Sequence, residues 1–225
     1  MKSASTLTTL YLHRNELLDF PFETLSQYTV LTSFSLYDNP LPSFPAIESD
    51  TLSTLYLGDA VYNTIPAGAL DSLPNMESFF TQNLYIDSMA TGLFRSLHEL
   101  RNIHMRGTAL THLDSQQFGV NSSVIDLIAL QNNHIATVDN EAFNGVQSGT
   151  INLINNKLTI LPEDTWGLLI DAGVHLQLQG NELLCGCDVA WLVLEPTYHE
   201  LVEDAVCHSG EKLVDLDPIF FINFC

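Results

Sequence analysis

Four cysteines lie near the end of this 225-residue chain, and their spacing is the strongest sign of covalent or metal chemistry in the sequence. They are Cys185, Cys187, Cys207 and Cys225. An even number of cysteines gathered at one end is typical of a disulfide unit formed in an oxidising compartment. The sequence alone allows three pairings, and a tetrahedral zinc site built from all four thiolates is the alternative.

Other reactive side chains do not match a recognisable catalytic or metal-binding motif. Gly210-Glu211-Lys212 lacks the upstream glycine and the Ser/Thr of a phosphate-binding loop, and there is no G-x-S-x-G. The run from His199 to Glu203 departs from the zinc-protease motif H-E-x-x-H at its last position, and the eight histidines show no ligand spacing. We therefore expect no enzyme activity, no cofactor and no metal site.

An internal repeat organises the chain upstream of the cysteines. The pattern L-x-x-L-x-L-x-x-N-x-L is met first by Leu7, Leu10, Leu12, Asn15 and Leu17. Eight frames of this kind begin at residues 7, 31, 52, 76, 100, 125, 148 and 173. Their spacing and pattern resemble those of leucine-rich repeats over almost the whole chain.

A single such repeat cannot bury its own apolar face, whereas stacked repeats share one continuous core. We therefore expect an α/β leucine-rich-repeat solenoid, in which the short x-L-x-L-x runs form a parallel concave sheet. Short helices, 3-10 turns and loops should lie on the convex side. The repeats should span residues 1–180, and a disulfide-bonded C-terminal cap should span residues 181–225.

Two further periodic positions support this frame. The asparagine position, which can satisfy backbone groups at the inward turn, departs from Asn at Ala60, Leu84 and Thr108, so we expect reshaped turns in the middle. Eighteen residues after the frame start we expect a buried spine, made by Leu25, Leu70, Phe94, Phe118, Phe143 and Trp166. The second repeat carries Pro40, Pro42 and Pro45, which predict a convex loop without a helix.

The segment from Cys185 to Leu192 contains a C-x-C pair followed by Trp191-Leu192, and two later cysteines complete the set. It resembles the cysteine-rich C-terminal flank of extracellular leucine-rich-repeat proteins. This resemblance implies the pairs Cys185–Cys207 and Cys187–Cys225, and places Trp191 and Leu192 on a short helix that covers the open end of the solenoid.

The run from Cys185 to Leu194, together with the irregular middle repeats, is also similar to an arthropod group of secreted repeat proteins. That group is named for the non-catalytic subunit of a crustacean luciferin monooxygenase. The resemblance implies a stabilising partner of a secreted enzyme.

Charge limits the partners of this chain. It has 27 acidic and 7 basic residues, for a net charge of −20. Such a charge disfavours nucleic acid and anionic membrane surfaces, and it favours a neutral or basic protein partner. No run approaches the roughly 20 apolar residues of a membrane span. The polar segment Met1 to Ser5 lacks a signal peptide, so we expect that a signal was removed or that the chain begins inside a longer one.

The concave sheet is where we expect binding, because alternate side chains of each strand point outward there. Aromatic side chains dominate the first five repeats, and amides dominate the last three. Arg106 lies between Gln82 and Gln131, whereas Arg101 lies between Glu77 and Asp126 and should form ion pairs with them. The predicted partner-binding residues are Tyr11, His13, Tyr37, Tyr56, Phe80, Gln82, His104, Arg106 and Gln131.

These features predict a secreted, non-enzymatic protein-binding module. Asn121-Ser122-Ser123 is an N-glycosylation sequon, which suits an extracellular protein. One alternative is the ectodomain fragment of a Toll-like or Slit-like receptor. Another is a structural or matrix protein that self-associates, for example through an uncapped N-terminal end, since no cysteines precede the first repeat.

Overall fold

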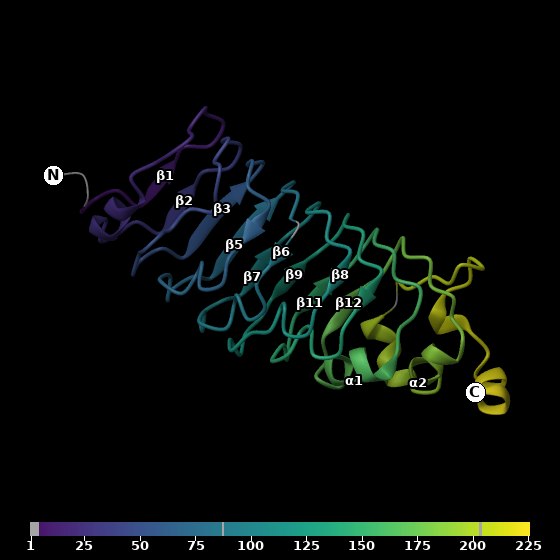
Figure 1. Cartoon of the computed structure of the whole chain (residues 1–225). Helices are drawn as coiled ribbons and strands as arrows, with labels where there is room; N and C mark the ends of the chain where they lie inside the picture. The colour runs from purple at the N-terminus through teal and green to yellow at the C-terminus, as the bar shows by residue number, and fades with distance from the viewer. Residues whose placement is uncertain (1–4, 87, 203) are drawn as a thin grey trace.

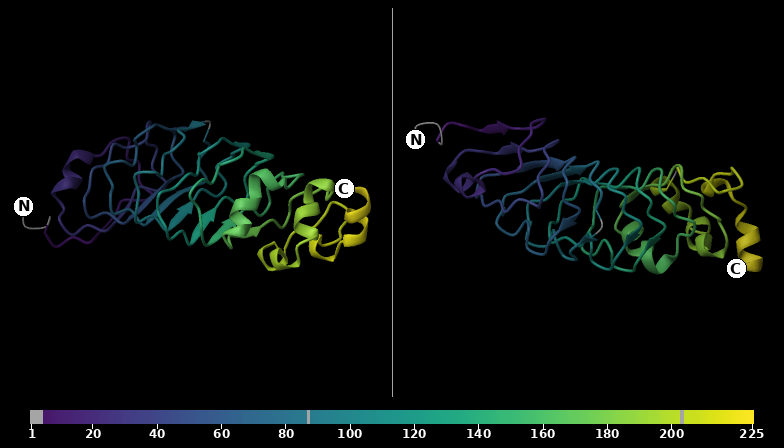
Figure 2. Two further views of the ribbon diagram at one scale, coloured as in Figure 1. Left: turned by 90° about the horizontal axis from the view of Figure 1, so that it is seen from below. Right: turned by 45° about the horizontal axis from the view of Figure 1, so that its top comes forward.

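The computed structural model describes residues 5–86, 88–202 and 204–225 as one elongated solenoid, with the two termini at opposite ends (Figures 1 and 2). Eight strands form one parallel sheet in the order β1-β2-β3-β5-β7-β9-β11-β12. Each strand falls in one of the eight sequence frames, which confirms the predicted leucine-rich-repeat fold. The strands are β1 Thr9–Tyr11, β2 Ser33–Ser35, β3 Thr54–Gly58, β5 Ser78–Gln82, β7 Asn102–His104, β9 Leu127–Ala129, β11 Thr150–Asn152 and β12 His175–Gln177.

The other side of each coil is built from short elements, as the sequence predicted. Two small parallel sheets pair β4 with β6 and β8 with β10. The second repeat, with its three prolines, contains no helix between β2 and β3. The elements are η1 Phe22–Gln27, β4 Thr64–Ile65, β6 Ser88–Met89, β8 His112–Leu113, β10 Thr137–Val138 and α1 Glu163–Asp171.

Buried apolar side chains run through the solenoid in two rows. The second residue of each strand of the eight-stranded sheet from β2 onward is almost fully buried, as Phe34, Phe79 and Ile151 illustrate. The second row is the predicted spine, in which the Phe94, Phe118, Phe143 and Trp166 rings follow one another at centroid distances of 5.8, 5.7 and 6.0 Å. Each repeat therefore buries its apolar side against the next, as a stacked fold requires.

Buried asparagines satisfy the backbone at the inward turns. Asn156 is representative: its Nδ2 donates to the carbonyls of Leu130 and Leu153, and its Oδ1 accepts from the Ile135 N–H, all at 2.9 to 3.0 Å. Asn39, Asn133 and Asn181 make the equivalent bonds, and the Asn133 Oδ1 also accepts from the Thr108 N–H. Each asparagine side chain thus supplies hydrogen-bond partners to backbone N–H and C=O groups that the turn buries away from water.

The middle turns are reshaped where the asparagine is missing. β3 and β5 extend to five residues, so that Gly58 pairs with Gln82 beyond the usual end of the strand. A Cβ on Gly58 would lie 2.4 Å from the Gln82 carbonyl oxygen, and its φ is +128°, so this close approach requires glycine. Additional ladder bonds thus replace the asparagine at this point of the sheet.

The C-terminal segment closes the solenoid with helices η2 Cys187–Val189, α2 Ala190–Val193, η3 Pro196–Leu201, η4 Leu213–Asp215 and α3 Pro218–Phe224. Disulfides join Cys185 to Cys207 and Cys187 to Cys225, the pairs that the resemblance implied, so the cysteines form no zinc site. Leu192 is fully buried, and the Trp191 indole N–H donates to the Leu161 carbonyl at 2.9 Å.

A cap carboxylate also finishes the main sheet. The Asp204 carboxylate accepts hydrogen bonds from the backbone N–H groups of Leu178 and Gln179, which directly follow β12. These donors would otherwise face a ninth strand. Charge-assisted bonds to Asp204 therefore close the edge of the sheet without another repeat.

Candidate functional site

The register of the concave sheet brings aromatic side chains from consecutive repeats into one row. Tyr56 pairs with Phe80 and Phe80 pairs with His104, each one residue after a fully buried strand residue. Side chains alternate along a strand, so these three rings point outward on the concave face. Ser35 pairs with Tyr56 on the other side and separates this row from Tyr11.

The three rings form a continuous stack. The centroids of Tyr56 and Phe80 are 4.4 Å apart with an interplanar angle of 18°, and those of Phe80 and His104 are 4.2 Å apart with an angle of 11°. Both separations are close to the spacing of about 4.8 Å between neighbouring strands. The backbone register therefore sets the stack, and we call Tyr56, Phe80 and His104 the aromatic stack.

A hollow of about 450 Å³ lies beside this stack at the N-terminal half of the sheet. Six of the nine predicted binding residues line it, and Arg14, Ser35 and Leu57 also do so. The lining residues are Tyr11, His13, Arg14, Ser35, Tyr37, Tyr56, Leu57, Phe80 and Gln82. His104 extends this surface through its contact with Phe80, whereas Arg106 and Gln131 lie outside the lining of the hollow.

Arg14 was not among the predicted binding residues, because it stands in the turn after the strand. The predicted residues occupy the two outward-facing strand positions of each repeat. Its φ of +56° places it in a left-handed conformation, and the corresponding residue of the next repeat, Asp38, has a φ of +57°. The Arg14 Nε and an Asp38 carboxylate oxygen are 3.9 Å apart, with both side chains more than half exposed. Such an exposed pair contributes little stability, so Arg14 remains accessible to a partner.

Arg101 and Arg106 differ in whether their charge is paired, as the sequence suggested. Arg101 Nε donates to Asp126 at 2.8 Å, so its charge is paired within the sheet, but the second expected ion pair, with Glu77, is not found among the described residues. Arg106 is exposed and has no ion pair within the described residues 5–86, 88–202 and 204–225. The Gln131 Oε1 in the next repeat is buried without a hydrogen-bond partner among those residues.

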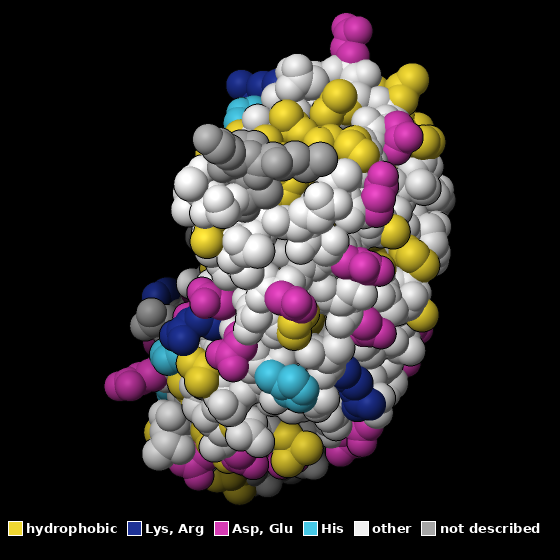
Figure 3. Space-filling model, turned by 90° about the vertical axis from the view of Figure 1, so that its left-hand side faces the viewer, with side chains coloured by type: hydrophobic (Ala, Val, Ile, Leu, Met, Phe, Trp, Pro, Cys, Tyr) yellow, Lys and Arg dark blue, Asp and Glu magenta, His cyan; other side chains and the backbone are white. Residues whose placement is uncertain are grey.

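Burial favours the uncharged forms of the two titratable side chains in the aromatic stack. Desolvation lowers the pKa of His104 below its ordinary value of 6.5. Desolvation raises the pKa of Tyr56, and the neighbouring Tyr11 adds a smaller effect in the same direction. The stack is therefore a neutral strip on a strongly acidic protein, and Figure 3 shows Asp and Glu side chains dispersed over the end of the molecule that includes β1.

Asn121 is exposed and lies in the segment between β8 and β9. Its Nδ2 donates to the Arg95 carbonyl at 2.7 Å, and the Ser122 hydroxyl accepts from the Val124 N–H. Glycosylation at this sequon stays a prediction. None of the helices within the described residues has the length and apolar character needed to cross a membrane.

Sequence comparison finds relatives of this chain, one of them over its whole length, although no protein-family profile matches it. The chain is 32% identical over 228 residues to the non-catalytic subunit of Oplophorus-luciferin 2-monooxygenase from Oplophorus gracilirostris. That alignment covers 100% of this chain and 63% of the relative. A probable glycoprotein hormone G-protein coupled receptor from Anthopleura elegantissima is 28% identical over 130 residues, which cover 56% of this chain and 14% of the receptor. This chain thus spans less than two thirds of either relative.

Solved structures share the fold at low sequence identity. Human trophoblast glycoprotein, also called 5T4, superposes with a TM-score of 0.66 at 16% identity, over 94% of this chain and 86% of that chain. Toll, in the Drosophila Toll–Spatzle complex, superposes with a TM-score of 0.69 at 16% identity, over 88% and 29% of the two chains. The repeat pattern, the eight-stranded solenoid and these comparisons agree that the chain has the leucine-rich-repeat fold with a disulfide-bonded C-terminal cap.

Proposed function

We propose that this chain is a secreted, non-enzymatic protein-binding module whose concave face contacts its partner. The aromatic stack beside the hollow of about 450 Å³ is the observation that carries this proposal. Tyr11, at the other side of the hollow, has 56% of its surface exposed. Aromatic groups held on a rigid sheet lose little conformational entropy on binding, which is why such groups dominate binding hot spots.

The relative that aligns with the whole chain suggests the role that such a binding module would have. That relative is named as the non-catalytic subunit of a monooxygenase. By analogy, this chain would be an accessory subunit that stabilises a secreted enzyme or another extracellular protein. Two disulfides in the cap agree with an extracellular location, because such bonds persist in oxidising compartments.

The chemistry of the surface defines the partner class. A neutral aromatic stack favours an apolar or aromatic side chain of the partner, and Arg14 and Arg106 are placed to receive carboxylates next to it. The net charge of −20 favours a partner that is neutral or basic overall. The partner should therefore combine a basic or neutral surface with an apolar contact patch that carries one or two acidic groups.

The proposal is tested by binding to proteins from the fluid into which the chain is secreted. The wild-type chain, a Tyr56→Ser/Phe80→Ala variant and a Leu168→Ala control are immobilised, and the retained proteins are identified by mass spectrometry. Leu168 is an apolar residue of α1 that is 82% exposed, so the control removes exposed apolar surface elsewhere on the molecule. One partner retained by the wild type and the control but lost by the double variant supports the concave site. Equal retention by all three refutes it.

A receptor ectodomain is the second candidate function. Similarity to part of a probable hormone receptor and the shared fold with Toll favour it. The gene sequence downstream of Cys225 decides between the two functions. A transmembrane helix encoded there would support the receptor, and a stop codon or another secreted domain would support the accessory subunit.

Self-association is the third candidate, and the first repeat favours it. Leu10 and Leu12 are only partly buried, whereas the equivalent Phe34 and Leu36 of the next repeat are 0% and 1% exposed. An exposed apolar repeat end is an association surface. Sedimentation velocity at several protein concentrations separates the cases, because a self-associating chain sediments faster as its concentration rises.

A further inference from the structure

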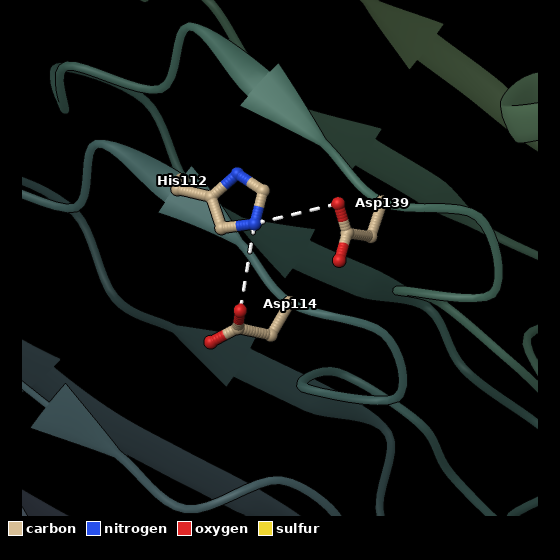
Figure 4. Close-up of side chains that lie close together, drawn as sticks. All are labelled: His112, Asp114 and Asp139. Carbon is tan, nitrogen blue, oxygen red and sulfur yellow. Dashed lines mark ion pairs between the residues drawn. The ribbon is translucent and has the colours of Figure 1, made fainter.

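His112, Asp114 and Asp139 lie close together outside the concave surface (Figure 4). The His112 Nε2 is 3.4 Å from an Asp114 carboxylate oxygen and 3.4 Å from an Asp139 carboxylate oxygen. All three potential ligand atoms lie within 4.8 Å of one another. The side chains of the three residues are between 40% and 60% exposed, so solvent reaches the space between them.

The repeat itself builds this cluster. β8 and β10 pair in register, with His112 opposite Thr137 and Leu113 opposite Val138. Asp114 and Asp139 follow these apolar residues directly. The two aspartates therefore occupy the same position of adjacent repeats. That position holds Ala90 in the preceding repeat and Pro162 in the following one, so the paired carboxylates occur at this single step of the solenoid.

Neighbouring groups fix the ligand atoms. His112 Nδ1 lies 2.5 Å from the Thr137 hydroxyl oxygen. In the tautomer in which Nδ1–H donates to Thr137, the Nε2 lone pair points toward the two carboxylate oxygens (Figure 4). The Asp114 N–H is held by Gln117 Oε1, and the Asp139 N–H donates to the Leu113 carbonyl. Three electron-pair donors that face one another form a site that a cation can occupy.

The spacing identifies the kind of cation. Zinc bound by nitrogen and carboxylate oxygen has bond lengths of about 2.0 to 2.2 Å, so two ligand atoms of a tetrahedral site lie about 3.4 Å apart. Both distances from His112 Nε2 have this value. Calcium and magnesium prefer sites made entirely of oxygen with more ligands, whereas imidazole with carboxylates suits zinc. The protein's strongly negative charge also raises the local concentration of cations.

We propose that His112, Asp114 and Asp139 bind one zinc ion that bridges the fifth and sixth repeats, with Thr137 positioning the imidazole. The three side chains leave a fourth coordination position for water or for a side chain of a partner. The sequence pattern did not suggest this site, because its ligands come from two repeats and no local motif contains them.

Isothermal titration calorimetry of the untagged, chelator-treated chain with zinc chloride alone tests the proposal. One zinc ion should bind per chain. His112→Gln and Asp139→Asn should each abolish this binding, and Thr137→Val should weaken the affinity by about 10- to 100-fold, as loss of a group that orients a ligand does. His134→Gln, which changes an exposed histidine outside the cluster, should bind zinc as the wild type does.

Cobalt substitution provides an independent readout. A tetrahedral cobalt complex should give intense visible absorption in the wild type and in His134→Gln, and none in His112→Gln. Absence of stoichiometric zinc binding in the wild type would overturn the proposal. Binding that survives both His112→Gln and Asp139→Asn would also overturn it, because the ion would then lie elsewhere. Circular dichroism of each variant verifies that loss of binding is not loss of folding.

Discussion

Asn156 offers a quantitative test of how the solenoid satisfies its buried backbone. Replacing it by alanine removes three hydrogen bonds: two from its Nδ2 to carbonyls and one from the Ile135 N–H to its Oδ1. The three losses are not equivalent. The Leu130 carbonyl also accepts from Asn133, and the Leu153 carbonyl also accepts from Asn181, so each carbonyl keeps one donor.

Only the Ile135 N–H is left without a partner, and this decides the magnitude. A buried unsatisfied donor costs about 1 to 3 kcal/mol, and each carbonyl loses one of two bonds, with a net value of about 0.5 kcal/mol at the low end. We therefore expect Asn156→Ala to lower the free energy of unfolding by about 2 to 4 kcal/mol. A ladder in which each carbonyl depended on one asparagine would lose more, because two further groups would be left unsatisfied.

Urea unfolding followed by circular dichroism measures the total, and amide hydrogen exchange locates it. The Ile135 amide should lose protection in Asn156→Ala. The Leu158 amide should keep more of its protection, because its acceptor is Asn181 Oδ1 in the next repeat. A change below about 1 kcal/mol would contradict the hydrogen-bond argument. Equal protection of the Ile135 and Leu158 amides in the variant would contradict its assignment to one orphaned donor.

Three further predictions concern the middle of the sheet. Thr81→Val should stabilise the chain by about 1 to 3 kcal/mol, since the fully buried Thr81 hydroxyl has no partner among the described residues; urea unfolding measures this. Gly58→Ala should destabilise it by at least about 1 to 3 kcal/mol in the same assay, because of its positive φ and the contact with Gln82. The pKa of His104, lowered by desolvation, should appear below 6.5 in an NMR titration. Just below pH 6.5 the unfolded chain then binds more protons than the folded chain. The free energy of unfolding should therefore fall as the pH decreases from 6.5 toward the pKa of His104 in the folded chain. His104→Gln should remove this part of the pH dependence of stability.

Matched variants keep these predictions specific. Thr137→Val removes a hydroxyl from an exposed position, so it should not stabilise the chain as Thr81→Val does. Gly173→Ala tests a positive φ without a nearby contact, because no heavy atom lies within 4 Å of the added Cβ; it should cost less than Gly58→Ala. A His104 titration at or above 6.5 would contradict the desolvation argument, as would an unchanged pH slope in His104→Gln.

Much of the concave surface could be predicted from the repeat because leucine positions fix the strand register. Once Leu55, Phe79 and Ile103 are assigned to the core, the following residues must form one outward row. The hollow was not predicted in full, because Arg14 reaches it from the left-handed turn after the strand, a position outside the two strand positions that were expected to face a partner. Arg106, chosen for its lack of a charge partner, lies beyond the residues that line the hollow.

The amino-acid sequence by itself determined the solenoid, its eight strands and the aromatic spine, because each depends on apolar residues that recur at a nearly constant interval. Tertiary structure decided what happens where that regularity fails. It extended the pairing of β3 with β5 near Ala60 and Leu84, it used the Thr108 hydroxyl to donate to the Met105 carbonyl, and it closed the last strand with Asp204. It also placed His112 between carboxylates of two repeats. Most of these contacts join residues of different repeats through side-chain direction, which a periodic pattern along one chain does not encode.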